Sequence, residues 1–517
     1  MKFFFFIYKI SIQQASENNE IEIIYYLLLK EKKVDENLFK NITKLVQISI
    51  PPTITSFESC SFENCSSLTR ISIPSSVTSI GYRAFKNCTS LEEVKIPISV
   101  TTIGEESFFK CLSLKKLIIP SSVTLIEEDA FFKCVALEQI SISSSITEIK
   151  ARTFYNCQSL KTIIIPPSVT FIGFSAFGKC RSLEQVSFLS SLTRIGNDVF
   201  SQCKSLKKII IPSSNTLIER TTFDNCTSLE DIVIPSSVTS IGEYSFCNCS
   251  SLKKITIPSS VTLIGSNAFR GCLSIEQIVI PSSVTSIESK AFYSCSSLKE
   301  ISIPSSIRSI GRDTFCYCTS LRQITIPSSV ISIGAFAFYN CESLTEISIP
   351  SSVTSISAFT FKNCTSLTYI SIPSSVTQIG DNAFEHCTSL IKISIPSSVT
   401  FIGSYSFSDC TSLTDFTFPP SVTTIKNHLF DECTSLKHIL IPSSVTTIED
   451  YAFVGCSSLT HVSIPPSVTS IGKNVFDGCS SLVQIAIPSH INPQILGINP
   501  NAEIIINNSR CYFCQVQ

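Results

Sequence analysis

The sequence predicts a β-solenoid of about twenty stacked coils of 23 residues each. A cysteine recurs every 23 residues over nineteen copies, from Cys65 through Cys249 to Cys479. Phenylalanine stands three residues before each of these cysteines and leucine three residues after it, with Ile275 as the one exception. A short strand pattern follows the leucine. A packed repeat cannot gain or lose a residue without misaligning its neighbours, so this constant period indicates stacked coils rather than low-complexity sequence.

Each coil is expected to begin with a short strand. In the copy LKKITIP, residues 252–258, Ile255 and Ile257 are two positions apart and therefore point to one side of a strand. A proline closes the strand in seventeen of the nineteen copies, which suits a strand end because proline has no N–H to donate. The segment VTSIG then turns the chain at a glycine, and the F-x-x-C corner returns it. Residues 38–57 fit the same template with Ile42 in place of the cysteine, and form a degenerate first coil.

This pattern, L-x-x-I-x-I-P-x-S-V-T-x-I-G-x-x-A-F-x-x-C, resembles the BspA-like, or Treponema-type, leucine-rich repeat family over roughly residues 35 to 488. The resemblance implies a right-handed leucine-rich repeat horseshoe with the parallel sheet on its concave face. It also implies a cell-surface antigen or adhesin that binds host matrix proteins or other cells. The asparagine ladder of other leucine-rich repeats is absent, and the family has no catalytic residues to carry over.

The chain ends suggest a division into three parts: residues 1–34, 35–488 and 489–517. Residues 16–33 have apolar side chains at helical spacing, with charge on the other face, and are expected to form a short helical cap. The first residues could pass for a signal peptide, but Lys9 interrupts the apolar run and no clean cleavage site follows. No run of about 18 or more apolar residues occurs, so no transmembrane helix is expected. Apolar residues after Ser489 are expected to close the other end.

The charge balance excludes a broad attraction to polyanions. The formal net charge of the 517 residues is −1. Since such attraction depends on an excess of basic residues, neither nucleic acid nor an anionic membrane is expected as a partner.

Nineteen of the 24 cysteines occupy the repeat position, and we expect them to be free, buried thiols. Neighbouring thiols would lie in parallel on strands about 4.8 Å apart, where the disulfide dihedral near 90° is hard to reach. A linear row also supplies no tetrahedral ligand set, so no metal is expected. For Cys511 and Cys514, a lone C-x-x-C in the tail, a disulfide or two unpaired thiols is favoured over a metal or redox role.

Residues that carry out catalysis do not converge in this pattern. The five histidines are scattered, and the serines belong to the PSSVTS turn, where hydroxyls cap backbone groups. Neither a nucleophile with a neighbouring base nor a glycine-rich phosphate loop is recognisable. We therefore predict that the protein is not an enzyme and binds no cofactor.

Six N-x-S/T sequons lie in the coils, five of them with the repeat cysteine as the middle residue. We expect these asparagines to bond to the backbone at the corner rather than to carry glycans. Asn507, in the tail, is the more accessible acceptor. The six are Asn41, Asn64, Asn87, Asn225, Asn248 and Asn363.

The strand surface carries two patterns. The residue after the repeat leucine alternates between Glu and Lys over ten coils, from Glu92 to Lys299, which favours register control and descent from a two-coil duplication over a docking surface. Beyond Arg322 the alternation stops, and the next position along becomes chemically distinct. We predict a partner-binding patch there, although drift among exposed positions is the simpler alternative. The patch comprises Tyr369, Lys392, Asp415, His438 and His461.

The sequence therefore predicts a non-enzymatic protein-binding repeat protein, whose protein ligand it does not identify. A surface or secreted adhesin agrees with the long sheet and with the resemblance. An intracellular interaction scaffold agrees with the unpaired cysteines, the poor signal sequence and the missing anchor. A purely architectural spacer is the third possibility, and it would bind only to itself.

Overall fold

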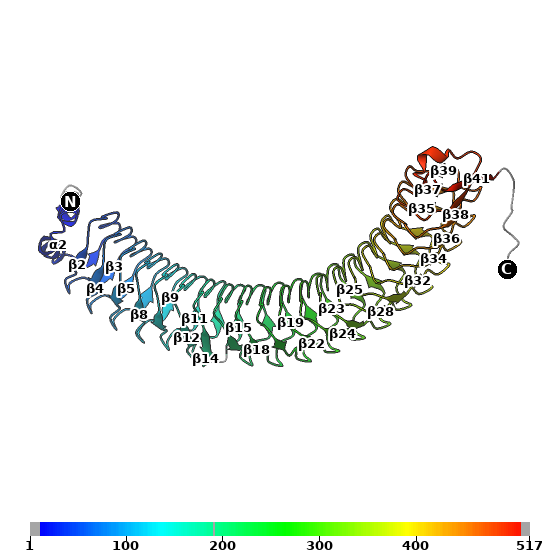
Figure 1. Ribbon diagram of the computed structural model, residues 1–517. Helices are drawn as coiled ribbons and strands as arrows, with labels where there is room; N and C mark the ends of the chain where they lie inside the picture. Colours follow the sequence, from blue (N-terminus) through cyan, green and yellow to red (C-terminus); the bar gives the residue numbers. More distant parts are fainter. Residues whose placement is uncertain (1–10, 190–191, 508–517) are drawn as a thin grey trace. The chain divides into compact units, whose positions relative to one another are not determined.

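The computed structural model describes residues 11–189 and 192–507, which belong to two compact units, Met1–Val261 and Thr262–Gln517. Both units are built from the same coil (Figure 1). Each coil supplies two short strands, and each strand pairs in parallel with a counterpart in a neighbouring coil, with breaks that divide the pairing into several sheets. We call the two resulting ladders the major ladder and the minor ladder.

The major ladder is formed by the strand that follows the repeat leucine. In the first unit its strands are β2 (Gln47–Ser49), β4 (Arg70–Ser72), β6 (Glu93–Lys95), β8 (Lys116–Ile118), β10 (Gln139–Ser141), β12 (Thr162–Ile165), β14 (Gln185–Phe188), β16 (Lys208–Ile210), β18 (Asp231–Val233) and β20 (Lys254–Ile255). In the second unit they are β22 (Gln277–Val279), β24 (Glu300–Ser302), β26 (Gln323–Thr325), β28 (Glu346–Ser348), β30 (Tyr369–Ser371), β32 (Lys392–Ser394), β34 (Asp415–Thr417), β36 (His438–Leu440), β38 (His461–Ser463) and β40 (Gln484–Pro488).

The minor ladder is formed by two-residue strands within the VTSIG segment. In the first unit these are β1 (Lys33–Val34), β3 (Ser56–Phe57), β5 (Ser79–Ile80), β7 (Thr102–Ile103), β9 (Leu125–Ile126), β11 (Glu148–Ile149), β13 (Phe171–Ile172), β15 (Arg194–Ile195), β17 (Leu217–Ile218) and β19 (Ser240–Ile241). In the second they are β21 (Leu263–Ile264), β23 (Ser286–Ile287), β25 (Ser309–Ile310), β27 (Ser332–Ile333), β29 (Ser355–Ile356), β31 (Gln378–Ile379), β33 (Phe401–Ile402), β35 (Thr424–Ile425), β37 (Thr447–Ile448) and β39 (Ser470–Ile471).

The strand register confirms the predicted β-solenoid of 23-residue coils. In the major ladder Ile71 pairs with Val94, and in the minor ladder Ile80 pairs with Ile103. Ile255 and Ile257 are both buried, as the strand pattern predicted. The sequence did not predict the minor ladder, because VTSIG was expected only to turn the chain. The horseshoe curvature and the handedness stay predictions.

The core of each unit is a column of stacked phenylalanine rings. Neighbouring rings lie nearly parallel: the Phe62 and Phe85 centroids are 5.2 Å apart, and those of Phe453 and Phe476 are 5.5 Å apart. Phe39 of the degenerate first coil joins the column, with its ring 4.9 Å from that of Phe62. Identical side chains therefore meet along each stack, as the repeat requires.

The corner segment, from two residues before each core phenylalanine to the repeat cysteine, is held by backbone bonds to the next coil. Phe62 N donates to Ala84 O at 2.8 Å, and Asn64 N donates to Lys86 O at 2.7 Å. Two residues of each corner have left-handed backbone, Arg83 (φ 55°) and Asn87 (φ 60°) in one coil. This conformation favours Gly, Asn and Asp, and it recurs in nearly every coil whatever the residue.

The repeat cysteines pack inside the corner as free thiols, as predicted. All 22 cysteines within the described ranges are free and buried. Cys364 Sγ donates to the carbonyl of Phe338 at 3.3 Å, and the same bond, 26 residues back, recurs along both stacks. Cysteine thus serves as a small hydrophobe with one weak donor. Cys511 and Cys514 lie outside the described residues.

Additional elements lie at the chain ends. Helix α2 (Ile21–Leu28) buries Ile24 and Leu28, and its preceding loop bonds to the first coil through Asn19 Oδ1, which accepts from Val46 N at 3.3 Å. At the other end, a 3₁₀ helix, η1 (Pro493–Ile495), leads to β41 (Glu503–Asn507), which pairs in parallel with β40. These contacts agree with end segments that pack on the stack, whereas the three predicted domain boundaries stay predictions.

Candidate functional site

The five predicted site residues lie in one row on the major ladder of the second unit. Each is the first residue of its strand, from Tyr369 in β30 to His461 in β38. The strand register pairs Tyr369 with Lys392, Lys392 with Asp415, Asp415 with His438, and His438 with His461. All five side chains are exposed. The structure therefore brings the whole set together, and its binding role stays a prediction.

Exposed apolar side chains accompany this row, and the sequence reasoning did not single them out. Leu440, two residues after His438 in β36, is 72% exposed, and Ile391, just before Lys392, is 53% exposed. Leu440 stands where the strand pattern points side chains outward, which was the available signal, whereas Ile391 lies just before β32. Similar residues recur at outward positions in other coils, for example Ile118 at 74%. Exposed apolar residues therefore add contact area to the row without marking it as unique.

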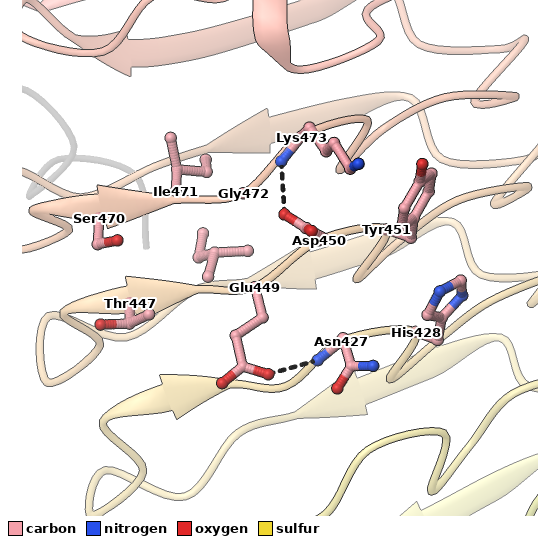
Figure 2. Close-up of a pocket in the computed structure, with 11 residues that line it drawn as sticks. Asn427, His428, Thr447, Glu449, Asp450, Tyr451, Ser470, Ile471, Gly472 and Lys473 are labelled. Carbon is pink, nitrogen blue, oxygen red and sulfur yellow. Dashed lines mark hydrogen bonds between the residues drawn. The ribbon is translucent and has the colours of Figure 1, made fainter.

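A pocket of about 620 Å³ lies beside the minor ladder and is lined by residues of the strands β37 and β39 and of the corner that carries His428 (Figure 2). The His428 ring stacks between Tyr405 and Tyr451, with centroids 4.5 and 4.9 Å away. Its Nδ1 lies 2.9 Å from Asp431 Oδ2.

The carboxylates of this pocket tie coils together. Glu449 Oε2 accepts from Asn427 N at 3.0 Å, and Asp450 Oδ1 accepts from Lys473 N at 2.9 Å, as the dashed lines in Figure 2 show. Both bonds join neighbouring coils and satisfy backbone groups. Within the described residues, His428 bonds to a carboxylate rather than to a hydroxyl or thiol. The pocket therefore offers no nucleophile and base in the arrangement that acyl transfer requires.

The alternating charge row contains one close ion pair in the second unit. Lys299 Nζ lies 2.7 Å from Glu276 Oε2, and its hydrogen bond lowers the pKa of the Glu276 carboxyl. Both side chains are at least half exposed, and exposed pairs contribute little to stability. The geometry agrees with register control.

The sequon asparagines bond to other side chains, chiefly to an asparagine of the neighbouring coil, rather than to the backbone. Asn64 Nδ2 donates to Asn41 Oδ1 at 2.6 Å, and Asn87 Nδ2 donates to Asn64 Oδ1 at 2.7 Å. In the second unit, Asn363 Nδ2 donates to Asn340 Oδ1 at 2.7 Å. The prediction of backbone bonding was therefore wrong. Asparagine is favoured there because it tolerates left-handed backbone and can bond to its counterpart in the next coil. The side chain of Asn507 lies outside the described part.

Burial holds the repeat thiols in their neutral form. Desolvation raises the pKa of Cys65, Cys134 and Cys295 to about 12, from an ordinary value of 9.0. The thiolate is the reactive and metal-binding form, so these thiols are inert in the folded chain. Among the described residues, no three or more His, Cys, Asp and Glu side chains gather in a way that could hold a metal ion.

Among the residues that the structure describes, no helix is both long enough and apolar enough to span a bilayer.

The fold and the site define a repeat protein of the leucine-rich β-solenoid class, with about 21 coils. The profile of the BspA-type leucine-rich repeat region, which holds six copies, matches residues 18–138, 101–230, 216–334, 285–413 and 378–495. Together these matches span most of the sequence. The chain belongs to the BspA-type leucine-rich repeat family.

Solved structures of bacterial leucine-rich repeat proteins are similar to the chain. One from Bacteroides ovatus is 24% identical, with 89% of this chain and 92% of that chain covered and a TM-score of 0.32. One from Eubacterium ventriosum is 26% identical, with 66% and 83% covered and a TM-score of 0.37. A leucine-rich cell surface protein from Faecalibacterium prausnitzii is 21% identical, with 90% and 88% covered and a TM-score of 0.27. With TM-scores this low, these superpositions add no argument beyond the family. A search of curated proteins finds no match.

Proposed function

We propose that the protein is a non-enzymatic binding protein that holds a protein ligand on the major ladder of its second unit. The observation that carries this proposal is the row from Tyr369 to His461, five exposed side chains of four chemical kinds in consecutive register. The row offers an aromatic ring, a cation, a carboxylate and two imidazoles within one continuous sheet. Tyrosine at the end of such a row suits an interface anchor, because its ring buries a large area at a small entropic cost.

The rigidity of the site supports the same proposal. The row stands on backbone that is hydrogen-bonded on both sides, in a sheet that runs from β28 to β41. A surface that is already ordered loses little conformational entropy when it binds. This favours recognition of a folded partner surface over capture of a small molecule, for which the exposed row provides no enclosing walls.

The proposal is tested with a triple variant, Tyr369→Ala, His438→Ala and His461→Ala. The purified protein and the variant are each passed over immobilised surface proteins of candidate partner cells, and the bound fraction is measured. A matched control carries Gln277→Ala and Gln323→Ala, at the same strand position in the sheet from β22 to β26. We expect the triple variant to lose binding and the control to retain it. Equal binding by all three proteins would refute the proposed row.

For the site of action we propose display at the cell surface or secretion, with an intracellular scaffold as the alternative. The resemblance to the BspA-type family implies a cell-surface protein, which favours display. The free thiols of the described chain favour the reducing interior instead. Protease treatment of intact cells separates the two, because a displayed protein is removed and an internal one is protected.

A further inference from the structure

A cluster of aromatic rings lies on the corner segments of the second unit. We call it, together with the cations described below, the ring–cation cluster. Phe336 and Phe359 stack with their centroids 4.5 Å apart and their planes at 5°. The Tyr317 ring stands edge-on to those of Tyr293 and Tyr339, at 5.6 and 5.4 Å. The five rings come from four consecutive coils and line an open cavity of about 390 Å³.

Cations lie over some of the ring faces of this cluster. They lie over three of the rings: Arg270 Cζ 4.9 Å from the Tyr293 centroid, Arg312 Cζ 5.2 Å from Phe336, and Lys362 Nζ 5.7 Å from Phe359. A ring whose face is covered presents its edge, and the edge is the positive part of the quadrupole. Ring edges and N–H groups together therefore form a surface that attracts anions.

The net charge of the cluster agrees with this. Lys290 adds a fourth cation to the lining. Two carboxylates oppose the four cations: Asp313, which lies 3.2 Å from Arg312, and Glu385, which lies 2.7 Å from Lys362. The cluster thus keeps a positive excess within a chain whose formal net charge is −1.

Three of the rings occupy backbone that does not suit them. Tyr317, Phe336 and Phe359 have φ values of 61°, 60° and 60°, in the left-handed region that bulky residues avoid. At the positions of Phe336 and Phe359, the next coil has Asn382, which accepts this conformation more readily. The stacked coils impose this conformation at every corner, so the fold holds the three aromatic residues there.

We propose that the ring–cation cluster binds an acidic polypeptide segment that carries bulky apolar side chains. Its guanidinium groups and ring edges suit carboxylates, and the apolar surface around the cavity suits aromatic or aliphatic side chains. A polyanion such as nucleic acid or a sulfated polysaccharide is held chiefly through charge and would leave the rings unused. A neutral sugar stacks on open ring faces, and three of these rings have a cation over one face. The cluster is a second surface, independent of the strand row proposed above.

The test uses three labelled short peptides on the full chain at physiological ionic strength: alternating Glu and Tyr, Glu alone, and alternating Lys and Tyr. We expect only the Glu–Tyr peptide to bind measurably, by fluorescence anisotropy. Equal binding of the all-Glu peptide would show that charge alone suffices and would overturn the proposal. So would a sulfated polysaccharide that binds tightly while the Glu–Tyr peptide does not.

Matched variants locate the binding. Arg270→Gln with Arg312→Gln should weaken binding of the Glu–Tyr peptide about tenfold or more. The control, Lys110→Gln with Lys133→Gln, removes the same charge from the first unit, where both lysines lie 5.4 Å from ring centroids. It should change affinity less than about twofold. An equal loss in both variants would mean unspecific attraction and would overturn the proposal.

A third variant separates binding from folding. Phe336→Asn with Phe359→Asn places a residue that suits left-handed backbone at both positions, so its thermal unfolding should match that of the parent. We expect it to lose the Glu–Tyr peptide; retained binding would overturn the proposal. The triple alanine variant of the strand row should bind the peptide normally, so the two proposals fail or succeed separately.

Discussion

Mild alkali should unfold both units, because the repeat thiols are held protonated inside them. Desolvation raises the pKa of sixteen repeat cysteines above the ordinary value of 9.0: Cys65, Cys88, Cys111, Cys134, Cys157, Cys180, Cys203, Cys226, Cys295, Cys318, Cys341, Cys364, Cys387, Cys410, Cys433 and Cys456. A pKa that is higher in the folded chain means that the unfolded chain releases its protons first. Stability is therefore fully present below about pH 9 and falls as the pH rises towards about 12.

The magnitude follows from the number of thiols. At about pH 10, deprotonation of each thiol stabilises the unfolded chain by about 1.4 kcal/mol. This holds for any pKa of the folded thiol, provided that the folded thiol stays protonated. Eight of these groups lie in each unit, so each unit loses roughly 11 kcal/mol, which is comparable to the usual 5–15 kcal/mol of domain stability. A stretch of four coils loses roughly 5 kcal/mol, enough for local opening.

The assay is urea unfolding, followed by circular dichroism under reducing conditions, from about pH 8 to about pH 10. The parent is compared with a variant in which Cys134, Cys157, Cys180 and Cys203 are replaced by alanine. Lysine and tyrosine titrate identically in both proteins, so the difference in pH slope isolates the thiols. The reasoning is refuted if the two proteins lose stability with the same slope above about pH 9.

Three further predictions concern packing. Phe361→Ala removes a ring that stacks on two others 5.5 and 5.4 Å away, and should lower the free energy of unfolding by about 3–5 kcal/mol. The cysteines of its own coil should then be alkylated first. Uniform alkylation of all the cysteines would contradict local packing. Ser107→Ala removes a buried hydroxyl that has no hydrogen-bond partner in the described structure. In thermal unfolding the variant should be more stable than the parent by about 1 kcal/mol. A lower melting temperature would mean that the hydroxyl makes a hydrogen bond after all. The alanine variant at Tyr369, His438 and His461 changes only exposed side chains, so urea unfolding should shift by less than about 0.5 kcal/mol. A larger loss would show that the row supports the sheet.

The sequence predicted the parts of the fold that depend on one residue type per coil. Phe62 and its counterparts had to stack, because each lies 23 residues from the next and no coil can bury its ring alone. The free thiols followed from the same argument, since Cys364 and its neighbours point in parallel. The row from Tyr369 to His461 is exposed, as alternation within a strand requires, and its binding role stays a prediction.

What the sequence did not reveal depends on backbone geometry. Two-residue strands such as β5 are too short to leave an alternating pattern, so the minor ladder stayed hidden. The left-handed corners were missed because residues such as Phe336 and Tyr317 rarely adopt positive φ and therefore do not predict it. The ring–cation cluster draws on five coils at four different positions of the repeat. Its members are therefore scattered in the sequence and meet only when the coils stack.

The constant register also has an evolutionary consequence. Because counterparts stand 23 positions apart, excising one full repeat, for example residues 342–364, joins chemically equivalent points and leaves every remaining ladder in phase. Unequal crossing-over between near-identical gene segments can therefore lengthen or shorten the array in whole coils. A deletion whose length is not a multiple of 23 residues would instead misalign the phenylalanines of the coils on its two sides, even if it kept the reading frame. Selection on such a gene can therefore change the number of coils without changing the residues that form the core.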